Sequence, residues 1–178
     1  ELARGQSVEL PGSQVEALRA ELKLEEGAPS AQALQPVIGQ RRAAKTIAGE
    51  ARGEPYVGQL GVAWVIINRV RADLWGDKKP DWWGEGVEAV CLKPKQFSCW
   101  NVGDKNRQFI DGLSDDAPEF LMAVHVYTGA ILGLLPDNTS GATHYHRRGI
   151  RPSWSIDVEP TCSLNNHVFY RAVEPGLR

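Results

Sequence analysis

A long apolar run at residues 56–70, YVGQLGVAWVIINRV, sets narrow limits on how the chain can fold. Its many β-branched residues would suit a strand, but its length favours a helix with an apolar face from Leu60 to Val70. Because the run is apolar on nearly every side, such a helix must be enclosed by the rest of the domain. We therefore expect a buried central helix, with Pro55 at its first position.

The segments around this run predict further helices and a small β element. Apolar residues at helical spacing predict a helix over 37–51, and another is expected after Asp115 and Asp116, which would cap it. Residues 71–116 are expected to form long loops with brief helices, because Gly, Pro, Asp and Trp interrupt every periodic piece. Near the C-terminus, THYH and HVFY alternate as strands do. The sequence thus predicts a mostly helical α+β domain.

The first 36 residues differ from the rest of the chain. They carry three basic and six acidic residues, a net charge of −3, whereas residues 37–178 sum to +1. Ser13 and Glu16 form a capping box that opens a short amphipathic helix. The expected organisation is an N-terminal helix and linker over 1–36 and a globular domain over 37–178.

The composition excludes two classes of partner. The chain has 20 Lys and Arg against 22 Asp and Glu, a net charge of −2, whereas a protein that grips nucleic acid normally has a basic excess. The apolar stretches fall short of the roughly 20 residues needed to cross a bilayer. We therefore expect no nucleic-acid partner and no membrane span.

The three cysteines do not follow a zinc pattern, because no C-x-x-C occurs. Cys91 and Cys99 flank a short Pro-containing segment and are candidates for a disulfide, although buried reduced thiols fit the spacing equally well. Phosphate-binding glycine loops and a G-x-S-x-G nucleophile elbow are both missing. We expect neither a cofactor nor a metal.

Two glutamates in the segment AGEARGEP, residues 48–55, are candidates for acid–base chemistry. Glu50 is expected in the last turn of a helix, where the negative end of the helix dipole opposes ionisation. Glu54 precedes the next helix, whose N-terminus favours the charged form. Opposite protonation states suit the cleavage of a glycosidic bond, but solvated helix caps are the ordinary interpretation of this spacing.

The same segment resembles a known family. The run TIAGEARGEPYVGQLGVAWVIINRV is similar to the start of the cell-wall hydrolases typified by spore-cortex-lytic enzymes. Later segments fit the family in order: VCLKPKQFSCWN at 90–101, ATHYH at 142–146, PSW at 152–154 and NHVFY at 166–170. The resemblance covers roughly residues 38–171, and its QFSCW and ATHYH segments look like those of proteobacterial and phage-borne members.

The resemblance implies a lysozyme-like, lytic-transglycosylase-like fold that acts on peptidoglycan glycan strands at the MurNAc–GlcNAc β-1,4 bond. The catalytic acid of the family maps onto Glu50. A transglycosylase would need only this carboxylate, whereas a muramidase would need a second group, for which Glu54 is the candidate. Glu54 could instead be a structural cap or form a salt bridge with Arg52. The sequence leaves both reactions open.

Further residues are expected to contact the sugar. The resemblance places one loop near the cleft and another segment opposite the catalytic helix, and tryptophans of the loop-rich regions would wall the cleft. The candidates are Gln96, Phe97, Trp100, Tyr145, His146 and Trp154, with Trp75, Trp82 and Trp83 as further walls. Tyr145 or His146 could also orient Glu50.

Two other functions fit parts of the sequence. His144 and His146 would lie on one face of a strand and, with His167, could hold zinc in a cell-wall amidase. A non-catalytic glycan-binding module could use the tryptophans as its platform. The leading expectation remains a monomeric peptidoglycan-cleaving enzyme that acts in the periplasm or the extracellular cell wall, or that a phage delivers there.

Overall fold

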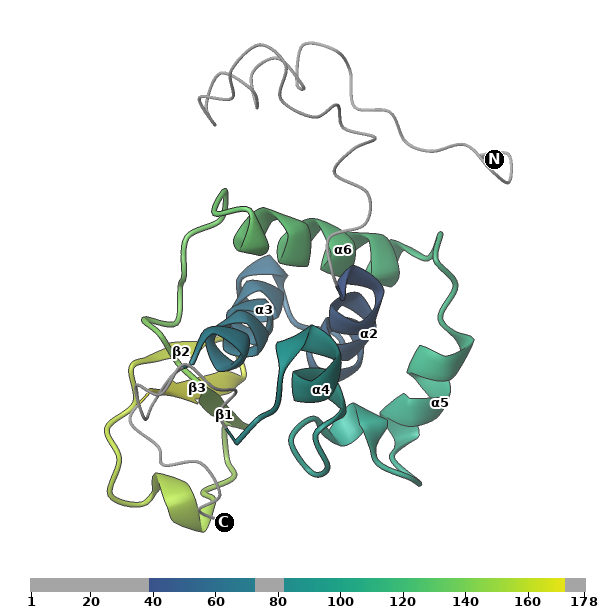
Figure 1. Cartoon of the computed structure of the whole chain (residues 1–178). Coiled ribbons are helices and arrows are strands. Elements are labelled where there is room, and N and C mark those ends of the chain that lie inside the picture. Colours follow the sequence, from purple (N-terminus) through teal and green to yellow (C-terminus); the bar gives the residue numbers. More distant parts are fainter. Residues whose placement is uncertain (1–38, 73–81, 172–178) are drawn as a thin grey trace, which may run out of the picture. The chain divides into compact units, whose positions relative to one another are not determined.

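The apolar run forms helix α3, Tyr56–Arg71, at the centre of the helical part of the computed structural model, which describes residues 39–72 and 82–171 (Figure 1). Val62, Val65 and Ile66 are fully buried, which confirms a helix enclosed on all sides. Pro55 is the N-cap residue and not the first helical residue, because its ψ of 166° is extended. The predicted helix and linker of residues 1–36 lie outside the described residues.

Two further helices pack on α3. Helix α2, Gln40–Glu50, begins after Gly39, whose φ of 74° is left-handed and therefore suits glycine. Helix α6, Pro118–Ile131, crosses over α2 and α3 (Figure 1). The α2 side chains that face these helices are mostly alanines, which allows a close approach.

The predicted caps of α6 were wrong. The N-cap residue is Ala117, which has no side-chain cap. Asp115 instead accepts from Arg41 at 2.8 Å, and Asp116 accepts a hydrogen bond from the Ser114 hydroxyl. The acidic pair is therefore used to fix the turn before the helix and to join it to α2.

The segment between α3 and α6 contains short helices, as predicted. They are α4, Gly86–Leu92, the 3-10 helix η1, Ser98–Trp100, and α5, Lys105–Gly112. Asp104 caps α5 by accepting the backbone N–H of Asn106 at 2.8 Å. These helices bring the loop 93–104 against the C-terminal end of α2.

The β element is a three-stranded antiparallel sheet in the order β1-β3-β2. The predicted THYH and HVFY segments supply β1, His144–Arg147, and β3, His167–Tyr170. Strand β2, Cys162–Leu164, was not predicted, and a 3-10 helix η2, Ser153–Ser155, lies in the connection before it. The architecture confirms the α+β prediction.

The described helices include none with the length and apolar character that crossing a membrane requires.

Candidate active site

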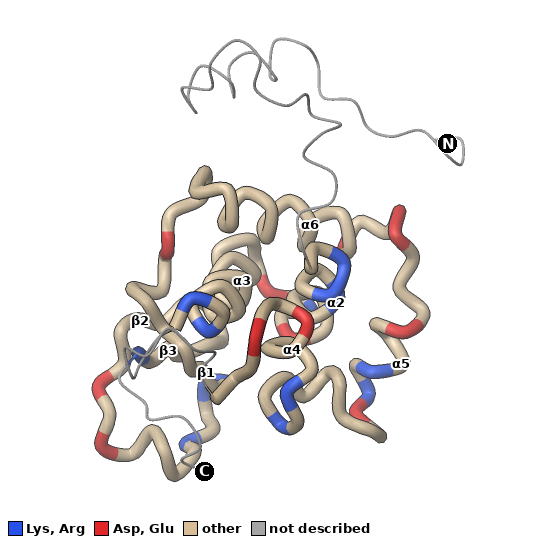
Figure 2. The backbone as a smooth tube through the Cα atoms, in the orientation of Figure 1, with Lys and Arg blue, Asp and Glu red and all other residues tan. Residues whose placement is uncertain are grey.

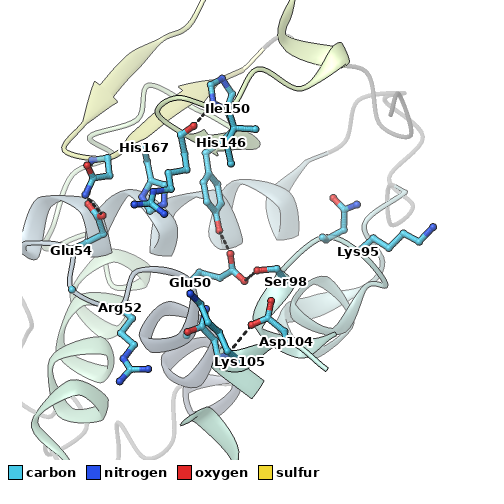
Figure 3. Close-up of a pocket in the computed structure, with 17 residues that line it drawn as sticks. Glu50, Arg52, Glu54, Lys95, Ser98, Asp104, Lys105, His146, Ile150 and His167 are labelled. Carbon is cyan, nitrogen blue, oxygen red and sulfur yellow. Dashed lines mark hydrogen bonds between the residues drawn. The ribbon is translucent and has the colours of Figure 1, made fainter. Parts of the chain in front are cut away.

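The carboxylate of Glu50 receives hydrogen bonds from two other parts of the fold (Figure 3). Its Oε1 accepts the backbone N–H of Cys99 at 2.7 Å and the hydroxyl of Ser98 at 3.2 Å. Its Oε2 accepts the hydroxyl of Tyr145 at 2.8 Å. Glu50 is the last residue of α2, Ser98 and Cys99 belong to η1, and Tyr145 belongs to β1, so helix and sheet meet at this side chain.

Gly49 permits the contact between α2 and η1. A Cβ at this position would lie 2.7 Å from the Cβ of Cys99 and 2.9 Å from the Cγ2 of Ile110. Both distances are shorter than side-chain carbons adopt, so only glycine lets η1 approach this closely. The close approach brings the Cys99 N–H to Glu50.

Two residues at the end of α3 hold the chain that leads into β1. Asn68 Nδ2 donates to the carbonyl of Ala142 at 3.0 Å, and Arg69 Nε donates to the carbonyl of Thr143 at 2.7 Å. Tyr145 follows two residues later. These bonds therefore fix the start of the strand whose hydroxyl reaches Glu50.

The environment of Tyr145 keeps its hydroxyl protonated. Burial, the neighbouring charge of Glu50 and the hydrogen bond to it raise the pKa of Tyr145 well above its ordinary value. Its ring packs against His167, with ring centres 5.0 Å apart, and against Phe169 at 5.7 Å. Tyr145 is thus a fixed hydrogen-bond donor at neutral pH.

Glu54 has a different environment from Glu50. Asn165 Nδ2 donates to its Oε2 at 2.7 Å and Asn166 Nδ2 donates to its Oε1 at 2.9 Å. Partial burial raises the pKa of Glu54, but the hydrogen bonds from Asn165 and Asn166 outweigh burial and lower it, as expected for the charged form. Of the two structural alternatives for Glu54, the salt bridge to Arg52 is not formed, because Arg52 lies over the ring of Phe109 at 4.3 Å. Glu54 holds the turn between β2 and β3.

A pocket of about 740 Å³ opens beside Glu50 (Figure 3). Its lining comes from the end of α2, the turns on either side of η1, the start of α5 and strands β1 and β3. The lining residues are Gly49, Glu50, Arg52, Gly53, Glu54, Lys95, Gln96, Ser98, Asp104, Lys105, Asn106, Tyr145, His146, Arg147, Ile150, Asn166 and His167. The predicted residues Glu50, Glu54, Gln96, Tyr145 and His146 are therefore brought together.

Three predicted substrate contacts lie elsewhere. Phe97 is 1% exposed and belongs to the core. Trp100 donates from Nε1 to the Thr46 hydroxyl at 2.9 Å. Trp154 packs its ring against the sheet histidines and Tyr170. None of the three lines the pocket. Burial removes Phe97 from contact with a ligand, whereas contact of the half-buried Trp100 and Trp154 with sugar stays a prediction.

The predicted tryptophan walls are not found either. Trp83 is fully buried, Trp82 lies against Lys93, and Trp75 is outside the described residues. The tryptophans of the described ranges fill the interior or pack on the surface, and the pocket is lined by polar and charged side chains.

The histidines of β1 are engaged within the sheet. Burial, helped by the charge of Arg69, lowers the pKa of His144 to about 3, and its ring packs against Trp83 and Trp154. His146 Nε2 is 2.9 Å from the hydroxyl of Tyr170. Over residues 39–72 and 82–171, no group of three His, Cys, Asp or Glu side chains is placed to hold a metal ion. The ligand set of the amidase alternative is therefore not assembled.

Cys91 and Cys99 are both free and buried, so the structure agrees with the alternative of reduced thiols and not with the disulfide. Burial raises the pKa of Cys91 to about 12 and also raises that of Cys99. Cys99 contributes to the site through its backbone N–H.

Sequence reasoning missed several residues of the site. Ser98 and the Cys99 N–H bind Glu50, while the cations Lys95, Lys105 and Arg147 line the pocket. The QFSCW segment pointed to the neighbourhood of Ser98, but no signal in the sequence distinguished the lining cations from other surface cations.

A sequence model described as Cell Wall Hydrolase matches residues 53–170. The chain belongs to the cell wall hydrolase family. The match begins just after Glu50, so family membership does not by itself assign a role to that residue. A spore cortex-lytic enzyme of Halalkalibacterium halodurans is 56% identical over 129 residues, which are 71% of this chain and 32% of that protein.

A separate similarity covers a shorter stretch. The ribosomal large subunit pseudouridine synthase B of Xanthomonas campestris is 67% identical over 60 residues, 32% of this chain. The chain spans 12% of the length of that enzyme and about a third of the spore cortex-lytic enzyme.

Two solved structures share the fold. The catalytic domain of the SleB protein of Bacillus cereus is 24% identical, with a TM-score of 0.57 over 82% of this chain and 100% of that one. The catalytic domain of the germination-specific lytic transglycosylase SleB of Bacillus anthracis is 23% identical, with a TM-score of 0.57 over 83% and 100%.

Proposed function

We propose that the chain is a lytic transglycosylase that cleaves peptidoglycan glycan strands at the MurNAc–GlcNAc β-1,4 bond, with Glu50 as the catalytic acid and base. One observation carries the proposal: Glu50 is the pocket carboxylate on which donors from η1 and β1 converge, where helix and sheet meet. Glu54 binds the Asn165–Asn166 turn, and Asp104 caps α5. The relationship to cell wall hydrolases supplies the substrate class.

In the first half of the reaction, protonated Glu50 gives its proton to the oxygen that leaves with N-acetylglucosamine. The bond from C1 of the muramoyl residue to that oxygen breaks, and positive charge develops on the muramoyl ring. Tyr145, Ser98 and the Cys99 N–H hold the Glu50 carboxyl group in one orientation, so the proton is delivered from a fixed position.

In the second half, the Glu50 carboxylate takes the proton of the C6 hydroxyl on the same muramoyl residue. The freed oxygen attacks C1 and closes a 1,6-anhydro ring. Glu50 regains the proton that it gave away, and no water is consumed.

The position of Glu54 supports this route over hydrolysis. A muramidase needs a second carboxylate to position water or stabilise the charged ring. Both oxygens of Glu54 accept hydrogen bonds from asparagine side chains of the turn between β2 and β3, which supports a structural role for this carboxylate. The B. anthracis structural neighbour is itself described as a lytic transglycosylase.

The experiment is mass spectrometry of purified peptidoglycan after digestion. Anhydro ends, lighter by one water, are expected for the transglycosylase, reducing muramic ends would indicate a muramidase, and free stem peptides an amidase. Glu50→Gln should abolish product release while the protein still binds the glycan, and Glu159→Gln, an exposed acid that does not line the pocket, should retain activity.

A chelator and a sedimentation assay separate the alternative functions. Activity that disappears with a metal chelator would favour the amidase over our proposal. A wild-type protein that binds cell walls and releases no fragments would be a glycan-binding module. We further propose that the protein acts as a monomer in the periplasm or the extracellular cell wall, because peptidoglycan lies there.

A further inference from the structure

Four basic residues from different elements line the pocket, and in Figure 3 the Lys95 and Arg52 side chains extend outward from its rim. Arg52 follows α2, Lys95 lies in the turn after α4, Lys105 begins α5 and Arg147 ends β1. All four are exposed. Figure 2 shows Lys and Arg on several separate segments of the backbone. The four pocket cations come from different elements, so the fold and not a basic run in the sequence gathers them.

Three of these cations have no side-chain partner among the described residues. Other arginines pair with carboxylates, as Arg42 does with Glu88 at 2.7 Å. In the part of the chain that the structure describes, the side chains of Lys95, Lys105 and Arg147 form no hydrogen bond, ion pair or ring contact. Their charges are therefore available to a ligand.

Three carboxylates, Glu50, Glu54 and Asp104, share the pocket with these cations, but each is held by donors other than the cations. Glu54 is bound by two asparagine side chains, and Asp104 accepts the Asn106 N–H at the start of α5. Glu50 is the proposed reacting group, and it is enclosed by its own donors. Among the described residues, none of these carboxylates forms an ion pair with Lys95, Lys105 or Arg147, so the three cations can bind an anion that enters the pocket.

The backbone presents Lys95 in an unusual conformation. Its φ of 66° lies in the left-handed region, which a residue with a Cβ adopts at a cost. The N–H of the next residue, Gln96, donates to the carbonyl of Lys93 at 3.1 Å and closes the turn. The turn keeps Lys95 at the edge of the pocket, with its side chain directed outward from the rim (Figure 3).

Resting on the proposed function, we infer that Lys95, Lys105 and Arg147 bind carboxylate groups on substituents of the glycan strand, so that the enzyme selects acidic strands over neutral β-1,4 glycans. Arg147 has the planar guanidinium that binds a carboxylate through two parallel hydrogen bonds, and the two lysines act as point charges. The carboxylates come either from the attached peptides or from the acid group on the sugar itself.

The test compares three polymers: peptidoglycan with its peptides, the same strands after enzymatic removal of the peptides, and a neutral β-1,4 polymer of N-acetylglucosamine. The variant is the triple substitution Lys95→Gln, Lys105→Gln and Arg147→Gln. Arg148→Gln is the matched control, because Arg148 is exposed and adjacent to Arg147 but does not line the pocket. Unfolding temperatures show whether each variant folds, and the single substitutions replace the triple one if it does not.

The triple variant is expected to raise KM by roughly tenfold to a hundredfold, since an exposed charge contact contributes up to about fivefold, and to leave kcat nearly unchanged. Added salt should raise the wild-type KM but not that of the triple variant. If KM of the triple variant rises only on peptide-bearing strands, the contacts are with the peptides. If KM rises on both peptidoglycan substrates, the contacts are with the acid group of the sugar.

Equal KM values for the triple variant and the wild type on both peptidoglycans would overturn the inference, as would wild-type cleavage of the neutral polymer at the same efficiency. If the wild type cleaved no glycan, the proposed function would fail separately. The inference would then be decided by co-sedimentation with the same polymers: weaker binding of the triple variant supports it, and equal binding overturns it.

Discussion

The hydroxyl of Tyr145 donates a 2.8 Å hydrogen bond to the carboxylate of Glu50, which lies 95 residues earlier in the chain. The bond joins the first strand of the sheet to the last residue of α2. It is the side-chain contact through which the β element acts directly on the proposed catalytic acid. Its removal is therefore a test of what the sheet contributes to catalysis.

Tyr145→Phe should lower kcat by roughly tenfold to a hundredfold, as expected when one positioning bond is lost at about 1.5–3 kcal/mol for a charged acceptor. KM should change little, because the ring still packs against His167 and Phe169. Steady-state kinetics on soluble peptidoglycan fragments measure both values. A KM effect without a kcat effect would show that Tyr145 binds the sugar and does not position Glu50.

Glu54→Gln should reduce stability but retain most of the activity. The glutamine keeps one acceptor oxygen, so the bond to Asn165 or to Asn166 is lost, at about 1 kcal/mol and a few degrees in unfolding temperature. Calorimetry and the glycan assay measure the two effects. If activity disappears while the fold is retained, Glu54 is the second carboxylate of a hydrolase.

The stability of the wild type should also depend on Glu54 at low pH. Because the pKa of Glu54 is lower in the folded protein than its ordinary value of 4.5, its ionised form stabilises the fold above that pH. This contribution should be lost as pH falls below 4.5 through the folded-state pKa. A comparison of wild type and Glu54→Gln between neutral and acidic pH isolates it, and an identical pH profile for the two proteins would contradict it.

Gly49→Ala should separate η1 from α2. The added methyl group would meet Cys99 and Ile110 at distances below 3 Å, which costs about 1–3 kcal/mol in overpacking. Activity should fall as well, because the Cys99 N–H no longer reaches Glu50. Gly112→Ala is the control, since no atom lies within 4 Å of its added Cβ. Similar unfolding temperatures and rates for both variants would rule out this role of Gly49.

The three thiols should react differently in the native protein. Cys91 and Cys99 are fully buried with raised pKa values, whereas Cys162 is partly exposed. A thiol reagent should therefore modify Cys162 first, and the other two only after unfolding. A non-reducing peptide map should contain no Cys91–Cys99 bridge. Finding the bridged peptide in protein isolated from an oxidising compartment would contradict this prediction and support the disulfide.

The local pattern predicted the helices well. The apolar run at 56–70 could only be buried, and small residues at helical spacing predicted α2. The caps of α6 were predicted wrongly, because acidic residues before a helix are also suited to side-chain bonds such as Asp115 with Arg41. Strand β2 was missed because three residues are too few to show an alternating pattern.

The tryptophans show a second limit. Their composition suggested flat walls for a sugar cleft, but a buried indole and a ligand-binding indole have the same signature in a sequence. Trp83 is enclosed by the core and Trp100 is bonded to Thr46, so packing decided their roles.

The sequence by itself determined the family resemblance, the α+β class and the placement of Glu50 at the end of a helix, because these depend on neighbours within a few residues. Only the tertiary structure decided which groups touch that carboxylate, that Glu54 holds a turn, and that cations from distant segments face one pocket. Those relationships join residues up to 112 positions apart, as in the bond from Asn166 to Glu54. Contacts between residues so far apart in the sequence depend on how helices and strands pack, and a local sequence pattern does not predict them.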